Sequence, residues 1–111
     1  KNQIDDIKNY ADAKSFLKKI IEFPFDISEE NYPYFKFYIK LKWNQQFKTK
    51  SIWNEVKDQI SFSLDSLQFG DIDKETGLLI IILDGLIENI ILNGKISMLQ
   101  YKYFLIHKYT L

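Results

Sequence analysis

Residues 78–94 read LLIIILDGLIENIILNG, and two incompatible structures compete for them. The dipeptides at 84–85 (Asp-Gly) and 93–94 (Asn-Gly) are preferred hairpin turns, which would produce a meander of strands. The apolar residues instead recur at the spacing of an amphipathic helix. They are Leu79, Ile82, Leu83, Leu86, Ile87, Ile90 and Ile91. We therefore predict one helix from about Lys74 to Asn93, with Gly94 as its left-handed terminator.

The same helix carries apolar residues outside this stripe. Leu78, Ile81 and Leu92 fall on the other side, together with Gly85. A helix that is apolar nearly all round is either central in its domain or docked to a partner. We expect Ile81 and Leu92 to form a contact surface beside Gly85, where the missing side chain permits close approach; a buried central helix is the alternative.

A first helix is predicted from about Tyr10 to Glu22. Asn9 and Asp12 have the spacing of a capping box, and apolar residues follow at helical intervals. Pro24 is expected to end the helix, because it restricts the preceding residue and donates no backbone hydrogen bond. Residues 25–33 are then a loop.

Residues 34–43 have a different period. Phe35, Phe37, Ile39, Leu41 and Trp43 alternate with Lys36, Tyr38, Lys40 and Lys42. Alternation is typical of a half-buried strand, here with one apolar and one cationic face. The candidate partner strands are residues 4–8 and 60–64.

Residues 51–67 favour another helix, with Ser51 as N-cap and Trp53, Val56, Ile60, Leu64 and Leu67 on one stripe. Residues 60–64 also alternate with serines, so a short helix followed by a strand stays open for residues 60–69. Ser97 and Gln100 resemble a capping box and predict a last helix.

These elements predict one domain over residues 1–111. The expected fold class is α+β, dominated by about four helices, with a small sheet that contains strand 34–43. An all-α bundle is the alternative.

The composition excludes several classes of site. The 111 residues include no cysteine and a single histidine, His107, so they cannot supply a zinc-thiolate site or a two-histidine metal motif. The four glycines lie too far apart for a phosphate-binding or dinucleotide-binding loop. The acidic run at 71–75 fails as a calcium loop, because Thr76 stands where the turn glycine is needed. We predict no enzyme activity, no metal and no cofactor.

The charges are segregated along the chain although they sum to zero. Residues 51–88 contain eight acids and two lysines, whereas residues 89–111 contain three lysines and no acid. Carboxylates on neighbouring helices could converge into a patch that attracts a basic partner. The predicted partner-binding residues are Asp65, Asp71, Asp73, Glu75, Asp84 and Glu88, with Ile81 and Leu92 as apolar contacts.

The predicted function is stoichiometric binding of another protein through this acidic surface. A bacterial toxin-immunity protein, which neutralises a basic toxin domain, is the class that such a small, motif-poor chain suggests. No apolar run is long enough for a membrane span, so no membrane partner and a cytoplasmic location are expected.

Two alternatives remain open. A nucleic-acid-associated regulatory module would use the lysines of the predicted strand and its extension, namely Lys36, Lys40, Lys42, Lys48 and Lys50. A homo-oligomeric structural subunit would use the surface around Ile81 and Leu92.

Overall fold

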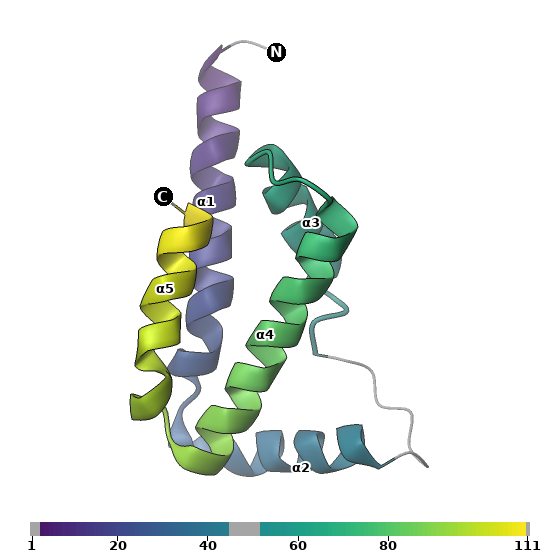
Figure 1. The fold of residues 1–111 in the computed structure, drawn as a ribbon, viewed down its shortest axis with the longest axis vertical. Helices are drawn as coiled ribbons and strands as arrows, with labels where there is room; N and C mark the ends of the chain where they lie inside the picture. Colours follow the sequence, from purple (N-terminus) through teal and green to yellow (C-terminus); the bar gives the residue numbers. More distant parts are fainter. Residues whose placement is uncertain (1–2, 45–51, 111) are drawn as a thin grey trace.

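A computed structural model describes residues 3–44 and 52–110, with side chains described from residue 11 onward, and in these ranges every regular element is helical (Figure 1). The elements are α1 (Gln3–Asp26), α2 (Tyr32–Trp43), α3 (Lys57–Ser66), α4 (Ile72–Asn93) and α5 (Leu99–Thr110), with short 3-10 turns η1 (Glu29–Asn31) and η2 (Ile96–Met98). The predicted α+β class is therefore wrong for this part of the chain, and the all-α alternative describes it.

The predicted strand 34–43 is helix α2. Pro33 occupies its first turn, where the missing backbone donor costs nothing. The buried residues are Phe35, Tyr38 and Ile39, whose i, i+3, i+4 spacing forms a helical stripe, whereas Phe37 points outward and is 61% exposed. Both predicted partner strands lie within helices, so a strand here would have had no neighbour among the described residues to satisfy its backbone groups.

Helix α1 starts earlier and ends later than predicted. It begins at Gln3, so Asn9 is inside the helix rather than at its cap, and it continues through Pro24 to Asp26. Pro24 and Phe25 are both buried, and this burial offsets the backbone bond that proline removes. Lys95 Nζ also reaches the carbonyl oxygen of Phe25 at 3.4 Å and satisfies one of the free acceptors at the helix end.

The prediction for the central apolar stretch is confirmed. Helix α4 is continuous through Gly85, and its predicted stripe is buried apart from Ile82, which is half-buried. Gly94 follows the helix with a φ of 89°, a conformation that favours glycine. The helix that we favoured over residues 51–67 is observed in part, as α3 from Lys57 to Ser66, and residues 60–66 form no strand. Its predicted start is wrong, because Trp53 and Val56 lie in the turn before α3; Ser51 lies outside the described residues.

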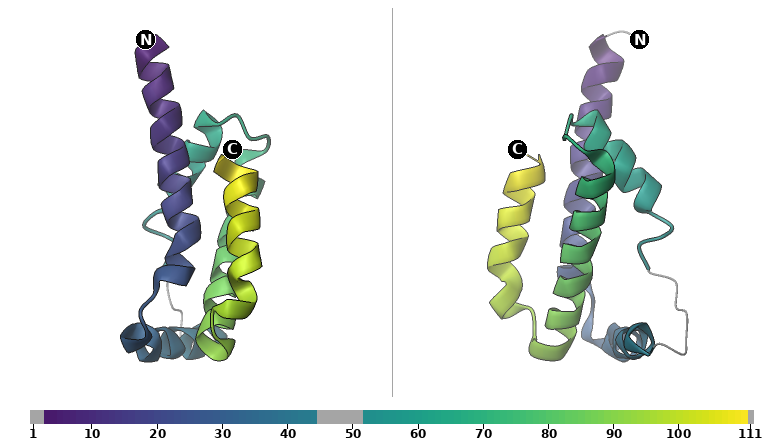
Figure 2. Two further views of the ribbon diagram at one scale, coloured as in Figure 1. Left: turned by 90° about the vertical axis from the view of Figure 1, so that its left-hand side faces the viewer. Right: turned by 45° about the vertical axis from the view of Figure 1, so that its right-hand side comes forward.

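Helices α1 and α4 are each packed against three other helices (Figures 1 and 2). Helix α1 packs against α3, α4 and α5, and α3 packs against α4. Helix α2 crosses the lower end of α4 and, among the described elements, its backbone approaches only α4 and η1. The buried side chains form one hydrophobic core, to which all five helices contribute.

Within the described ranges, no helix combines the length and the apolar composition that a membrane crossing requires.

Candidate protein-binding surfaces

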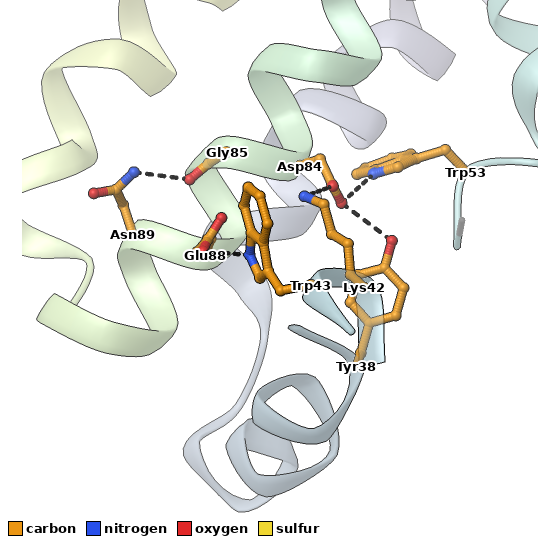
Figure 3. Close-up of polar contacts among 8 residues, drawn as sticks. All are labelled: Tyr38, Lys42, Trp43, Trp53, Asp84, Gly85, Glu88 and Asn89. Carbon is orange, nitrogen blue, oxygen red and sulfur yellow. Dashed lines mark hydrogen bonds and ion pairs between the residues drawn. The ribbon is translucent and has the colours of Figure 1, made fainter. Parts of the chain in front are cut away.

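Asp84 joins α2, α4 and the turn before α3 (Figure 3). Its carboxylate accepts hydrogen bonds from the Tyr38 hydroxyl at 3.4 Å and from Trp53 Nε1 at 3.3 Å, and it also contacts Lys42 Nζ. The Asp84 side chain is only 13% exposed. It is thus an internal acceptor that holds three segments together.

Glu88 has a similar structural role one turn further along α4. Its carboxylate accepts a 3.0 Å hydrogen bond from the indole Nε1 of Trp43, the last residue of α2. Partial burial by itself would lower the pKa of Lys42, but the carboxylates of Asp84 and Glu88 outweigh it and raise that pKa above its ordinary value. Both of these predicted partner-binding carboxylates therefore face α2.

The acids of residues 65–75 lie at the opposite end of α4. Asp71 is the N-cap of the helix and accepts a hydrogen bond from the backbone N–H of Lys74 at 3.3 Å. Asp73 is exposed in the first turn, where a negative charge is favoured by the helix dipole. Asp65 is exposed on the last turn of α3.

Glu75 differs from these neighbours because it turns partly inward. Its Oε2 atom is buried without a hydrogen-bond partner among the described residues, and so is the hydroxyl of Tyr109 on α5. Burial, reinforced by the negative charge of Glu75, raises the pKa of Tyr109. Glu75 is consequently a poor contact residue for an external protein.

The six predicted carboxylates do not form one surface. The helical rise of 1.5 Å per residue places Asp84 about 16 Å further along α4 than Asp73. Ile81 and Leu92 are also separated, since Ile81 lines a groove between α4 and α5, whereas Leu92 lines one between α4 and α2. Of these six carboxylates, only Asp65 and Asp73 are exposed and have no internal role among the described residues.

A different acidic surface lies between α1 and α3. We call it the acidic groove; the described residues that line it are Asp12, Ala13, Phe16, Asp58, Gln59, Phe62 and Ser63. It has a volume of about 420 Å³. Two of the described residues that line it are charged, Asp12 and Asp58, and both are acidic. Phe62 is 67% exposed, and Asp65 lies one helical turn beyond it.

The sequence did not predict this groove, because one residue from each of its two helices had a different predicted role. Asp12 was expected to close a capping box, and Phe62 was expected to share a buried face with Ile60 and Leu64 if residues 60–64 formed a strand. In the helix, Ile60 and Leu64 are fully buried and Phe62 is not. The available signal was that Phe62 falls outside the Ile60–Leu64 helical stripe.

A second charged groove, the lysine groove, lies between α2 and the end of α4. The described residues that line it are Pro33, Lys36, Phe37, Ile39, Lys40 and Leu92, around a volume of about 480 Å³. Lys36 and Lys40 are exposed one turn apart, whereas Lys42 faces Asp84. The predicted nucleic-acid set is thus divided, and its members Lys48 and Lys50 lie outside the described residues.

The third groove is apolar. Helices α4 and α5 do not approach each other closely, and the space between them, about 570 Å³, is lined by Ile81, Tyr101 and Phe104 among others. None of its described lining residues is charged. Ile81 is 69% exposed there.

Comparisons with protein-family models, with curated proteins and with solved structures find no match to this chain. In the described ranges, no three histidine or acidic side chains are grouped closely enough to hold a metal ion. The candidate sites are the three grooves.

Proposed function

We propose that this protein acts by stoichiometric binding of a basic partner protein in the acidic groove, in the manner of a toxin-immunity protein or another inhibitor. The observation that carries the proposal is the exposed ring of Phe62 beside the carboxylates of Asp12 and Asp58. The proposal assigns binding and no catalytic step, and it places the protein in the cytoplasm, in keeping with a chain that contains no cysteine.

The groove combines the two features that protein recognition needs. An aromatic side chain at the centre of a contact supplies apolar area, and such residues often dominate the binding free energy. The carboxylates around it attract a basic surface from a distance and disfavour acidic competitors. Phe16 and Ala13 supply an apolar floor on α1, so a partner's apolar side chain would lose contact with water there.

Asp65 extends this surface along α3 and is the member of the predicted acidic set that the proposal retains. Asp84 and Glu88 are left out, because withdrawing them from α2 would leave Lys42 and the indole of Trp43 without their acceptors. The proposed partner therefore carries lysine or arginine side chains around an apolar residue, and it meets α1 and α3 rather than α4.

The experiment uses a synthetic amphipathic helical peptide of leucine and lysine as the probe, and a peptide with glutamate in place of lysine as its counterpart. Backbone amide NMR shifts are followed during titration. Shifts confined to α1 and α3 with the lysine peptide, and absent with the glutamate peptide, are expected. Shifts that map to other helices, or that are equal for both peptides, would contradict the proposal.

Matched variants separate the acidic groove from general electrostatic attraction. Asp12→Lys/Asp58→Lys should abolish the binding, and Phe62→Ala should weaken it at least about tenfold, as loss of a central aromatic contact does. Glu29→Lys/Glu30→Lys changes the net charge equally but lies on η1, so it should retain most of the affinity. The same variants, co-expressed with the product of the neighbouring reading frame, would test a natural partner.

A further inference from the structure

We infer that the chain binds a second copy of itself by seating the lysine groove of one molecule against the acidic groove of another. The inference rests on the proposed function, since it names a partner for the same acidic groove. It also goes beyond it, because it assigns a role to the lysine groove, which the proposed function does not use.

The lysine groove carries an aromatic residue between two charges. Lys36 and Lys40 are four residues apart on α2, so their side chains emerge on one face with about 6 Å of helix between them. Phe37 is exposed beside them, and the exposed side chain of Leu92 faces it from α4. Neither lysine forms an ion pair with a described residue, in contrast to Lys42.

The acidic groove has the opposite charges in a comparable arrangement. Asp12 and Asp58 face it from α1 and α3, and neither is ion-paired within the described ranges. Phe62 protrudes there to nearly the same extent as Phe37 does on α2. Each groove thus offers an exposed phenylalanine, a concave apolar floor and a pair of like charges, and the two pairs have opposite sign.

This charge complementarity selects a second copy in a defined orientation. Pairing two acidic grooves or two lysine grooves would place like charges opposite each other, which is unfavourable. Pairing one of each would oppose the carboxylates to the lysines and let both phenylalanine rings leave water. The contact joins two different surfaces, so it closes into a dimer only if both contacts form at once, and otherwise it continues as a chain of molecules.

The test is the mass of the protein in solution, measured by sedimentation velocity over about a hundredfold range of concentration, because mass action drives association. The wild type should gain mass as its concentration rises at low salt, and this gain should shrink at high salt. A wild type that stays monomeric throughout at low salt would overturn the inference.

Charge exchange identifies the surfaces. Asp12→Lys/Asp58→Lys and Lys36→Glu/Lys40→Glu should each be monomeric alone, whereas their equimolar mixture should form a mixed complex, because the exchange restores opposite charges. Phe37→Ala keeps every charge and should weaken association at least about tenfold. Ile81→Lys, in the apolar groove, should associate as the wild type does.

The outcomes distinguish this inference from the proposed function. A monomeric wild type that still binds the lysine peptide in the acidic groove would overturn self-association alone. A monomeric wild type that does not bind the lysine peptide would overturn both self-association and the proposed function. Association lost in Ile81→Lys but kept in the charge variants would assign the interface to α4 and α5 and overturn the inference. Far-UV circular dichroism of each variant confirms that the helices are intact.

Discussion

The ammonium group of Lys42 contacts the carboxylate of Asp84, 42 residues later in the sequence, and this pair fixes α2 on α4. Among the described elements, the backbone of α2 approaches only α4 and η1, so side chains have to hold its far end. Tyr38 and Trp53 donate to the same carboxylate, and Trp43 donates to Glu88 one turn away (Figure 3). The position of α2 on α4 therefore depends on these polar contacts as well as on the burial of its short apolar stripe.

Replacing Asp84 should destabilise the fold much more than replacing an exposed acid. Asp84→Ala removes the acceptor of three donors in a largely buried place, and we expect the free energy of unfolding to fall by about 2–3 kcal/mol. Asp65→Ala, an exposed acid at the end of α3, should change it by less than about 0.5 kcal/mol. Urea denaturation measures both, and equal effects would refute the structural role of Asp84.

The hydroxyls of Ser61 and Thr76 form a second pair that can be tested, at 2.8 Å between α3 and α4. Thr76→Val removes one hydroxyl and leaves the half-buried hydroxyl of Ser61 without its partner. The free energy of unfolding should therefore fall by about 1 kcal/mol. Adding Ser61→Ala removes both groups and should recover much of that loss. A double variant whose loss equals the sum of the two single losses would show that the hydroxyls do not interact.

Gly85 and Gly94 should respond in opposite ways to alanine. Gly85 lies inside α4, where an added Cβ would meet no atom within 4 Å, so Gly85→Ala should raise the free energy of unfolding by about 0.5–1 kcal/mol. Gly94 has a φ of 89°, so Gly94→Ala should lower it by about 1 kcal/mol. Thermal unfolding compares the two, and a destabilised Gly85→Ala would mean that a neighbour occupies the space beside it.

Stability should fall on the alkaline side of about pH 10. The folded-state pKa of Tyr109 lies above its ordinary value of 10.0, and that of Lys42 lies above 10.5. Both groups hold their protons more tightly in the folded state, so their contribution is complete below these ordinary values and is lost as the pH rises through the folded-state values. Tyr109→Phe should flatten the decline seen in melts from pH 8 to pH 11, whereas Tyr103→Phe, at an exposed site on α5, should not.

Helix α4 could be predicted from the period of its apolar residues alone. A stripe of seven large apolar residues has to be buried, and this holds for any neighbouring element. The same reasoning succeeded for Ile60 and Leu64 in α3. It failed for residues 34–43, where alternating apolar residues suit a strand but also include the helical stripe of Phe35, Tyr38 and Ile39. A strand depends on hydrogen bonds to a distant partner, and nothing local indicates that the partner is missing.

The candidate sites depended still more on distant neighbours. The residue types alone established that the chain carries no thiol chemistry and keeps its charges in separate segments, and their spacing predicted helix α4. Tertiary structure alone determined that Asp84 and Glu88 face α2, and that Asp12 and Asp58 meet across a groove. A helix presents its carboxylates all around its axis, so the packing of a second helix decides which of them bind inside the molecule and which reach solvent.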